Sequence, residues 1–366
     1  MKRILHYVGS MDYGGMEAVI MSLYRNIDRS EWQFDFAVHG NNRGYYEEEI
    51  EKLGGKVFRF PMMRNNPRLY KRLWNQFWQK HKEEYYGFQM HTNSLANIVA
   101  LKASKKYGVP VRAIYAHSSY ADKGRYQIIH DIIHKWNRKH ITKYANVKFA
   151  CSELAAKWLY GVTDLQQNSV ILMNNGIDYH RFRYNEGART YIRAQLALEE
   201  KFILCQVGHM LPVKNHIFTI SLLKQLPDNI VCIFLGDGTL RGQLLKKVYE
   251  EGLQNKVFFL GMKPNVEDYL SASDAFIMPS RYEGMPLAVV EAQVSGLPCF
   301  VSANITRMAQ ISDMVNYYEI SDAREWVDGI KRQSIKKQHN RNTVNLDNKF
   351  DVKVTAKEYI ERISIV

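Results

Sequence analysis

The feature that most constrains the fold of this 366-residue chain is a repeated alternation of short apolar runs and helical patterns. In the first half the strand-like runs are 3–8, 34–39, 56–60, 87–92, 111–117 and 147–152, and the helical patterns are 16–28, 45–53, 94–107 and 124–144. In the second half the runs are 202–208, 231–236, 257–261, 274–280 and 298–302, and the helical patterns are 215–225, 239–252, 265–272 and 286–295. Strands rich in Val, Ile and Phe that alternate with helices are typical of parallel sheets covered on both faces. The sequence therefore predicts an α/β protein.

The alternation falls into two blocks, which predicts two doubly wound, Rossmann-like domains. The segment 179–200 is charged and has no strand pattern, so we expect the first domain to cover 1–180 and the second 181–345. Residues 346–366 have the pattern of an amphipathic helix, which we expect to cross back to the first domain. Open parallel sheets bind ligands at the carboxyl ends of their strands. The residues that follow each strand are therefore the candidates for function.

Composition and charge narrow the class of protein. With 46% hydrophobic and 24% charged residues, the chain is not disordered, collagen-like or a coiled coil. The net charge is +13, and residues 1–180 hold most of the excess, with 26 basic and 16 acidic residues. This asymmetry suggests a polyanionic partner or a membrane surface for the first half. The widely spaced cysteines indicate free thiols in a reducing cytoplasm, and no apolar stretch is long enough to predict a transmembrane helix.

The loop after the predicted strand 274–280 leads into a helix that begins near Pro286. Proline is favoured there because its missing N–H costs nothing at a helix start, and the free N–H groups of that first turn can bind an anion. Glu283 lies in the loop and Glu291 lies inside the helix, so both carboxylates can face one pocket and accept sugar or ribose hydroxyls. The alternative is structural, with Glu283 interacting with the helix dipole and Glu291 on a solvated face.

The whole segment PSRYEGMPLAVVEAQVSGLP resembles the E-x7-E signature of the retaining glycosyltransferases of family 4. That family has the GT-B fold, in which two Rossmann-like domains face a central cleft. The resemblance implies that Glu283 contacts hydroxyls of the donor sugar as a catalytic residue, and that Glu291 holds the ribose of the nucleotide. It also implies that the backbone of Gly284, Met285 and Pro286 approaches the donor.

A second motif, VGHMLPVKNH, follows the predicted strand 202–208 and is similar to the family pattern G-R-x-x-x-x-K. Lys214 matches the family lysine and can neutralise a diphosphate. His209 stands where the family has arginine, which puts one phosphate contact in doubt. A histidine can still hydrogen-bond a phosphate, more weakly when it is neutral. A solvated surface role is the alternative for both residues.

Two glycine-rich turns also match the family. Gly14, Gly15 and Glu17 follow the first predicted strand, and the resemblance to G-G-x-E implies that they line the cleft near the phosphates and the acceptor. Gly236 and Gly238 match a G-x-G pattern beside the nucleotide. Glycine permits close backbone approach, and a helix start favours an anion. The second turn does not continue as a dinucleotide fingerprint, because its third glycine falls one residue late.

Two histidines end neighbouring predicted strands. His117 closes the strand 111–117, and the resemblance implies that it points at the donor sugar, near the reacting centre. His91 closes the strand before it and is a candidate for the acceptor side. A histidine at a strand end also fits a purely structural role.

Two stretches of the first half combine basic residues with apolar ones. The stretch 62–82 holds six Lys or Arg and no acid, with Leu, Trp and Phe at helical spacing. The stretch 123–148 holds seven basic residues against one acid. A basic amphipathic helix is typical of binding to anionic lipid. The same pattern fits a helix whose apolar face packs on the domain core, and the sequence leaves both explanations open.

The resemblance implies the reaction as well as the site. The expected donor is a nucleotide-sugar, usually a UDP-sugar, and the expected acceptor is a lipid-linked saccharide in capsule or exopolysaccharide biosynthesis. Transfer on the front face would retain the anomeric configuration. The chain has no D-x-D motif, so we expect no metal and no bound cofactor. The expected location is cytoplasmic, peripheral at the inner face of the cell membrane.

Two other functions compete with this interpretation. One is a nucleotide-sugar 2-epimerase on a similar fold, against which the E-x7-E pattern argues. The other is a non-enzymatic nucleic-acid-binding protein, suggested only by the net charge of +13. No recognised nucleic-acid motif accompanies that charge, so we expect no nucleic-acid partner.

Overall fold

The computed structural model describes residues 1–12, 14–117, 127–167, 169–336 and 341–365. The chain forms two compact units: unit 1 comprises Met1–Gly176 and Phe350–Val366, and unit 2 comprises Ile177–Lys349. The division after Gly176, where the sequence placed it after residue 180, has a local cause. The short helix α8 (Tyr179–Phe182) packs against helices of unit 2, and the Tyr179 hydroxyl donates to the carbonyl oxygen of Asp347 at 2.7 Å.

Unit 1 is built on a parallel sheet that has seven strands in the described residues, in the order β3-β2-β1-β4-β5-β6-β7. The strands are β1 (Lys2–Tyr7), β2 (Trp32–His39), β3 (Val57–Phe60), β4 (Gly87–Thr92), β5 (Val111–Ala116), β6 (Val147–Ala150) and β7 (Ile171–Leu172). The helices are α1 (Gly15–Asn26), α2 (Glu47–Lys52), α3 (Pro67–His81), α4 (Val99–Lys106), α5 (Gln127–Lys139), α6 (Glu153–Leu159), α7 (Val162–Gln166) and α15 (Val352–Ser364). The strand order reverses between β1 and β4, so this unit has its switch point at the ends of those strands.

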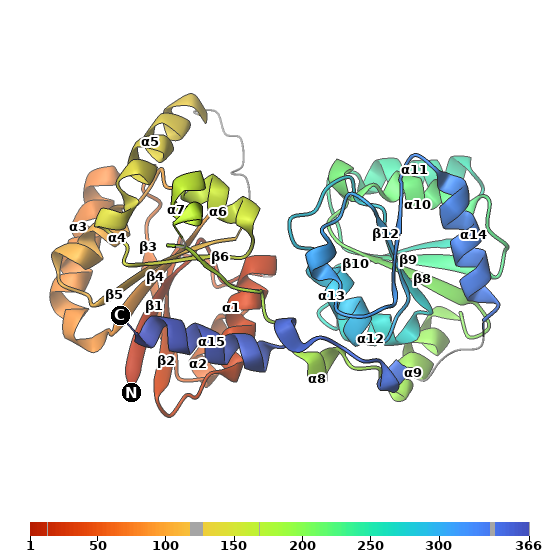
Figure 1. Cartoon of the computed structure of the whole chain (residues 1–366), viewed down its shortest axis with the longest axis horizontal. Coiled ribbons are helices and arrows are strands. Elements are labelled where there is room, and N and C mark those ends of the chain that lie inside the picture. Colours follow the sequence, from red (N-terminus) through yellow and green to blue (C-terminus); the bar gives the residue numbers. More distant parts are fainter. Residues whose placement is uncertain (13, 118–126, 168, 337–340, 366) are drawn as a thin grey trace. The chain divides into compact units, whose positions relative to one another are not determined.

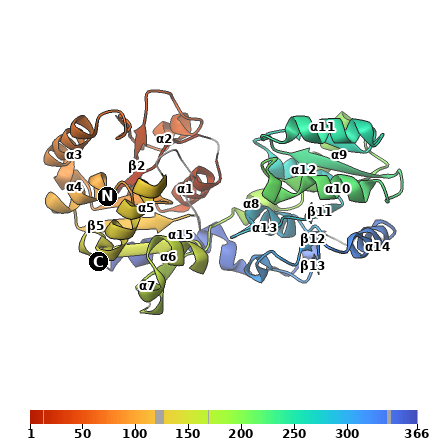
Figure 2. The ribbon, with the colours of Figure 1, turned by 90° about the horizontal axis from the view of Figure 1, so that it is seen from above.

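The last helix of the chain, α15, belongs to unit 1. It packs against α1, and its Tyr359 and Ile363 are buried in the core of that unit. The helix is drawn in blue among the red and orange elements of unit 1 in Figure 1, and Figure 2 shows the same helix from above. It begins at Val352, where the Asp351 side chain accepts a hydrogen bond from the Lys353 backbone and so caps the first turn.

The periodic aromatic residues of the stretch 62–82 form the inner face of α3. Tyr70, Trp74 and Trp78 are fully buried, and Trp74 stacks on Phe60 of β3 with 4.0 Å between the ring centroids. These rings therefore belong to the core of unit 1 and are not available to a lipid surface. The hypothesis of a lipid-binding apolar face is wrong for the aromatic residues of this stretch, while its Lys and Arg residues are exposed.

Unit 2 is built on a parallel sheet whose described strands have the order β10-β9-β8-β11-β12-β13. The strands are β8 (Phe202–Val207), β9 (Ile230–Leu235), β10 (Val257–Gly261), β11 (Ala275–Met278), β12 (Cys299–Ser302) and β13 (Val315–Tyr318). Besides α8, the helices are α9 (Glu186–Leu196), α10 (His216–Leu223), α11 (Arg241–Glu250), α12 (Val266–Ala272), α13 (Leu287–Val294) and α14 (Ala323–Ser334). Figure 1 shows α10 and α11 on one side of the sheet and α12 and α13 on the other. The order reverses between β8 and β11, which is the switch point of this unit.

The predicted α/β class, with two doubly wound Rossmann-like units, is confirmed. Two edge strands, β7 and β13, have no counterpart among the predicted elements. Both are short, and β13 has the partly polar sequence VNYY, so neither gives the apolar run on which the prediction depends. Helices α9 and α14 also have no counterpart among the predicted elements. The prediction located elements from apolar strand-like runs, and these two segments contain none.

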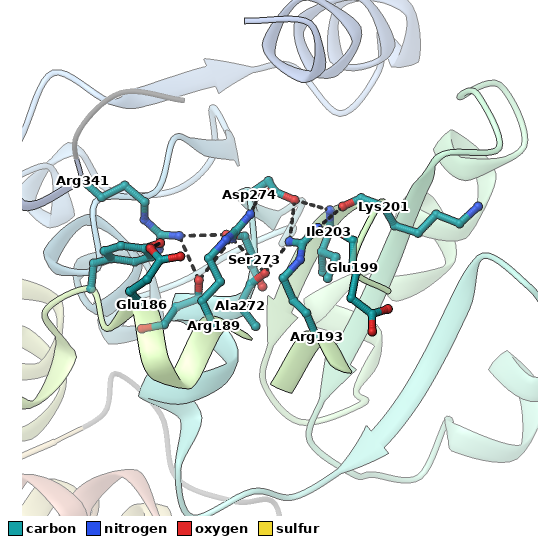
Figure 3. Close-up of polar contacts among 12 residues, drawn as sticks. Glu186, Arg189, Arg193, Glu199, Lys201, Ile203, Ala272, Ser273, Asp274 and Arg341 are labelled. Carbon is teal, nitrogen blue, oxygen red and sulfur yellow. Dashed lines mark hydrogen bonds and ion pairs between the residues drawn. The ribbon is translucent and has the colours of Figure 1, made fainter. Parts of the chain in front are cut away.

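A buried cluster of arginines ties α9 to the end of α12. Arg189 and Arg193 lie 2.6 Å and 3.1 Å from the carboxylate of Asp274, and Figure 3 shows both guanidinium groups directed at it. A third member, Arg341, donates to the carbonyl oxygens of Leu270, Ser271, Ser273 and Ser295. The Asp274 charge and the carbonyl end of the helix offset this buried positive charge. The cluster therefore fixes the start of β11, the strand that leads to the candidate site.

Candidate active site

Two loops of unit 2 are fastened together at its switch point. One loop follows β8 and the other follows β11, two strands that are hydrogen-bonded neighbours. The backbone N–H of Arg281 donates to the carbonyl oxygen of Val213 at 2.8 Å, and the side-chain amide of Asn215 donates to the carbonyl oxygen of Pro279 at 3.1 Å. These bonds hold the two loops side by side at the carboxyl edge of the sheet, where doubly wound folds bind ligands.

The paired loops bring together Lys214 and Glu283, two residues that the sequence singled out. Nζ of Lys214 lies 2.7 Å from Oε1 of Glu283, and the side chains are 21% and 13% exposed. The contact is an ion pair without hydrogen-bond alignment, since Oε1 accepts no hydrogen bond from the residues that the structure describes. Both side chains are thus partly exposed at the end of the two loops, although Oε1 itself is buried.

Gly208 gives the Lys214 side chain its path. A Cβ at Gly208 would lie 3.3 Å from Cε of Lys214, and the φ angle of +144° is one that side chains rarely adopt. The Lys214 backbone is held as well: its carbonyl oxygen accepts from Nε2 of Gln206 at 3.0 Å, and Oε1 of Gln206 accepts from the Thr219 hydroxyl at 2.7 Å. The position of Lys214 is therefore set by buried polar contacts beneath the loop.

Gly236 and Gly238 follow β9 and lie against the loop after β8. A Cβ at Gly236 would lie 2.2 Å from the carbonyl oxygen of Gly208, and a Cβ at Gly238 would lie 2.7 Å from backbone atoms of Met210. Only glycine permits these approaches. Backbone packing beside the Lys214 loop thus accounts for both glycines, and a contact with the nucleotide stays a prediction.

His209 lies in the same loop and is exposed. Among the described residues its imidazole has no hydrogen-bond or ion-pair partner within the protein. Nothing in the fold accounts for a histidine at this position, so the predicted contact with a phosphate remains open to test.

The loop after β11 continues into α13, which begins at Leu287 with Pro286 as its cap residue. The predicted start at Pro286 is therefore early by one residue. Met285 and Gly284 precede it and are half-buried. A Cβ at Gly284 would meet no described atom within 4 Å, and its φ is not positive. Packing does not require glycine here, which is consistent with a ligand that approaches this backbone.

Glu291 lies in α13 and is half-buried. Burial raises its pKa to about 7, and the positive charge of Arg181 partly opposes that rise. Arg181 itself binds the carboxylate of Glu267 at 2.8 Å and 2.9 Å. Within the described part of the chain, Glu291 has no ion pair or side-chain hydrogen bond. Near neutral pH it is therefore divided between its acid and its carboxylate form.

In unit 1 the glycine turn after β1 leads into α1, which begins at Gly15. The Glu17 side chain folds back over Gly14, where a Cβ would lie 2.3 Å from Oε2 of Glu17. Burial raises the pKa of this carboxyl above its ordinary value. A Cβ at Gly15 would meet none of the described atoms within 4 Å. A side chain at the first position would displace the end of the Glu17 side chain, and one at the second would meet no contact within the described protein.

His117 follows β5, and the structure joins it to two other histidines. Its Nε2 lies 2.7 Å from Nδ1 of His91, and Nε2 of His91 lies 2.9 Å from Nδ1 of His6. Burial lowers the pKa of His117 and of His6 to about 3 and lowers that of His91. All three are therefore neutral at physiological pH. Neutral imidazoles hydrogen-bond a ligand but do not neutralise an anion.

The sequence singled out His117 and His91 but missed their connection to His6. The available signal was positional, because His6 lies in the predicted strand 3–8, which neighbours the strand of His91 in a doubly wound sheet. Among the residues that the structure describes, no three His, Cys, Asp or Glu side chains form a group that could hold a metal ion. That the reaction needs no metal stays a prediction.

Comparison with known proteins places the chain in a family. The family model described as Glycosyltransferase Family 4 matches residues 13–181, and that described as Glycosyl transferases group 1 matches residues 188–345. EpsF of Bacillus subtilis (strain 168), which is named as a glycosyltransferase, is 34% identical over 316 residues, which cover 83% of this chain and 80% of EpsF. The chain belongs to the family 4 glycosyltransferases. The predicted family and a transferase activity are thereby confirmed.

Two further proteins relate this family 4 glycosyltransferase to named activities and folds. The UDP-Gal:alpha-D-GlcNAc-diphosphoundecaprenol alpha-1,3-galactosyltransferase of Escherichia coli is 29% identical over 233 residues, 60% of this chain and 59% of that enzyme. The crystal structure of HepE from Anabaena in complex with UDP-glucose superimposes with a TM-score of 0.78 at 18% identity and covers all of both chains. The second likeness shows the fold, two Rossmann-like units of GT-B type.

Proposed function

We propose that this glycosyltransferase transfers a sugar from a UDP-sugar to a lipid-linked saccharide and retains the anomeric configuration. The observation that carries the proposal is the Lys214–Glu283 pair at the switch point of unit 2, with Nζ and Oε1 2.7 Å apart and the side chains 21% and 13% exposed. The E. coli relative is named for a UDP-galactose donor and a diphosphoundecaprenol-linked acceptor, and HepE was solved with UDP-glucose. These names support the proposed classes of donor and acceptor.

In the proposed complex Lys214 binds the donor diphosphate and Glu283 accepts hydrogen bonds from the sugar hydroxyls. The ion pair holds both groups in place before the donor arrives and limits the cost of ordering them. The ammonium group then stabilises the charge that develops on the leaving diphosphate. Groups preorganised in this way are worth about 3–4 kcal/mol each in characterised enzymes. No metal or bound cofactor takes part in the proposal.

The α13 region holds the rest of the nucleotide. Ionised Glu291 accepts hydrogen bonds from the ribose hydroxyls, and the backbone of Gly284 and Met285 approaches the donor. The first turn of α13 has N–H groups without partners in the helix, which favour negative charge. His209 adds a hydrogen bond to a phosphate oxygen.

The proposed chemistry takes place on one face of the donor sugar. The bond between the anomeric carbon and the diphosphate oxygen breaks, and the acceptor hydroxyl oxygen forms the new bond on the same face. The hydroxyl proton passes to the leaving phosphate oxygen. His117 donates a hydrogen bond to the sugar as a neutral imidazole. The turn at Gly14, Gly15 and Glu17 lines the site near the phosphates and the acceptor.

Helix α5 supports a membrane location for the acceptor. The large apolar residues on its outer face are 39–76% exposed; they are Ile128, Ile129, Ile132, Ile133 and Trp136. Its inner face is attached through polar groups instead: Nδ1 of His134 accepts from the backbone N–H of Leu95 at 3.1 Å, and the Asn137 amide donates to the Leu95 carbonyl at 2.7 Å. This arrangement is the reverse of an ordinary surface helix, whose apolar side faces the core.

The charge on α5 indicates what covers the apolar face. Its last two turns carry Lys135, Arg138 and Lys139. A helix with exposed isoleucines and a tryptophan beside basic residues fits an anionic lipid surface. We therefore propose that α5 docks the protein on the membrane, while residues 123–126 of the predicted stretch 123–148 lie outside the described residues. None of the described helices combines the length and apolar character needed to cross a bilayer.

A donor and acceptor screen tests the function. Nucleoside diphosphate release is measured for UDP-, GDP- and TDP-sugars, with and without lipid-diphosphate-linked saccharides, and the product linkage is determined by NMR. We expect acceptor-dependent release from a UDP-sugar and an α linkage from an α-configured donor. A β linkage would contradict retention, and acceptor-independent formation of an epimerised UDP-sugar would contradict transfer.

A further inference from the structure

A run of hydrogen-bonded side chains crosses unit 1 from the last helix of the chain to the end of β5. The Tyr359 hydroxyl of α15 donates to Oε1 of Gln89 at 2.6 Å. Nε2 of Gln89 lies 3.3 Å from Nε2 of His91, and Nδ1 of His91 lies 2.7 Å from Nε2 of His117. Tyr359, Gln89 and His91 are at most 4% exposed. The run connects a buried tyrosine to a candidate catalytic histidine.

The fold explains why these residues meet. Gln89 and His91 occupy alternate positions of β4, so both side chains lie on the same face of the sheet. His6 of the neighbouring strand β1 pairs in register with Gln89 and lies 2.9 Å from His91. Helix α15 supplies Tyr359 to this face, with its ring 6.5 Å from that of His6. The C-terminal segment thus completes a polar network that begins in the first strand.

The Tyr359 hydroxyl sets the direction of the hydrogen bonds. A buried O–H without an acceptor costs about 1–3 kcal/mol, so its proton lies toward Gln89 and the atom that receives it is the amide oxygen. The amide nitrogen of Gln89 then faces His91 and can only donate. Nε2 of His91 is consequently the nitrogen without a proton. Neutral His91 carries its proton on Nδ1 and donates it to Nε2 of His117.

His6 is consistent with this direction. Its Nδ1–H also donates to the bare Nε2 of His91, which leaves the proton off its own Nε2. That Nε2 atom is buried and has no partner among the described residues. A buried lone pair without a partner costs less than a buried N–H without one. The opposite direction would leave an N–H in that position.

We propose that Tyr359 and Gln89 are positioning residues that act through His91 to hold His117 in the tautomer with its proton on Nδ1. The inference rests on the proposed function, in which His117 contacts the donor sugar. Because Nε2 of His117 is occupied by the bond from His91, Nδ1–H is the group left for a ligand. His117 therefore acts as a hydrogen-bond donor to the sugar and not as a base. The last helix of the chain thereby sets the protonation of a residue that follows β5.

The direct test is nitrogen-15 NMR of the histidine side chains in the full-length protein without substrate, with H117N and H91N used to assign the signals. We expect His117 as the Nδ1–H tautomer and His91 likewise. The substitution Q89E replaces the donating amide with an acceptor, so His91 and then His117 should both change to Nε2–H. Y359F removes the directing proton, so the His117 signals should show a mixture of both tautomers. An Nε2–H tautomer of His117 in the wild type would overturn the proposal.

A matched control is Y160F, which removes another buried hydroxyl of unit 1, placed 2.9 Å and 2.8 Å from the carbonyl oxygens of Ile114 and Phe149. It should leave the His117 tautomer unchanged. In the transfer assay we expect Q89E to lower kcat about tenfold with little change in KM for the donor, as the loss of one hydrogen bond predicts. Q89E without a change of tautomer would refute the relay, and if Q89E fails to fold, Y359F carries the same test. Unchanged transfer in H117A would refute the role of His117 in the proposed function and leave the tautomer assignment standing.

Discussion

The Lys214–Glu283 pair of unit 2 is charged and partly exposed, whereas the chain of histidines in unit 1 is neutral and mostly buried. Lys214 and Glu283 form an ion pair at the end of β8 and β11, and both keep part of their surface exposed. His117 and His91 form a chain of imidazoles whose pKa values are lowered by burial. Both groups lie near the switch point of a doubly wound sheet. The same fold thus supports charge recognition in one unit and neutral hydrogen bonding in the other.

In the proposed function the two units contribute different interactions to the transfer. A diphosphate needs a cation at its binding site, and unit 2 presents one on a loop fixed by Gln206 and Asn215. A sugar hydroxyl needs a donor or an acceptor in a defined orientation, which a neutral histidine of fixed tautomer supplies. Substitutions that change charge in one unit and hydrogen bonding in the other test this difference.

The largest effect is expected from K214A. Loss of the ammonium group should lower kcat/KM for the donor about 100- to 1,000-fold and weaken binding of UDP, because the diphosphate charge is no longer neutralised. UDP release and isothermal calorimetry measure the two effects. The control is K224A, which removes an equally charged lysine from a surface ion pair with Glu251 in the same unit. Wild-type transfer in both K214A and E283Q would contradict the site assignment.

A smaller effect, of a different kind, is expected from H117A. Removing one neutral hydrogen-bond donor should lower kcat about 10- to 100-fold and leave the affinity for UDP unchanged, since the imidazole carries no charge at physiological pH. Because its pKa is about 3, the pH profile of the wild type between 6 and 9 should contain no transition from His117. Weaker UDP binding in H117A would show that the division between the units is incorrect.

The membrane proposal predicts that unit 1 alone carries lipid affinity. The double substitution I132N/W136S should reduce binding to vesicles of phosphatidylglycerol and phosphatidylcholine about tenfold, because both side chains are more than half exposed on α5. The double substitution K71S/K80S on α3 serves as the control, since the aromatic face of that helix is buried. Flotation assays measure both. A loss in K71S/K80S with no loss in I132N/W136S would attribute binding to basic charge alone and contradict docking through α5.

The smallest effect concerns Glu291, whose pKa is raised to about 7 by burial. Between its ordinary value near 4.5 and 7 the folded protein binds more protons at this site than the unfolded chain, so stability falls as pH rises through that range. E291Q should therefore be more stable than the wild type at pH 8, by roughly 1–2 kcal/mol of unfolding free energy. At pH 4.5 the variant and the wild type should have the same stability. Thermal unfolding at both pH values measures this.

The same carboxyl links pH to donor binding. Only ionised Glu291 accepts two ribose hydroxyls, so affinity for UDP should rise as pH increases from 6 to 8 in the wild type and stay constant in E291Q. A parallel rise in the variant would assign the pH dependence to the phosphate or to another residue.

Much of the fold and of the unit 2 site could be predicted from the sequence. Alternating apolar runs and helices determine parallel sheets, and residues directly after a strand reach the sheet edge without further assumption. Lys214 and Glu283 are candidates on this ground, and the resemblance to the family supplies their expected roles. The fold and these two candidates need only the order of residues along the chain and the pairing of neighbouring strands in the sheet.

The unit 1 network could not be predicted, because its members are distant in sequence. Tyr359 meets Gln89 only after α15 returns to the first unit, and nothing in either segment indicates the partner. Helices α3 and α5 show the same limit. Both sequences combine basic residues with apolar ones, yet α3 buries its aromatic face and α5 exposes its isoleucines.

Local sequence patterns were enough to predict the class of fold, the two-unit organisation and the charged residues that follow the strands of unit 2. These properties arise from local periodicity and from residue types at strand ends. The tertiary structure decided which helix presents an apolar face to solvent and which hydrogen bonds fix the tautomer of His117. Burial and hydrogen-bond direction depend on what packs against a residue, and that is settled only when segments far apart in the chain come together.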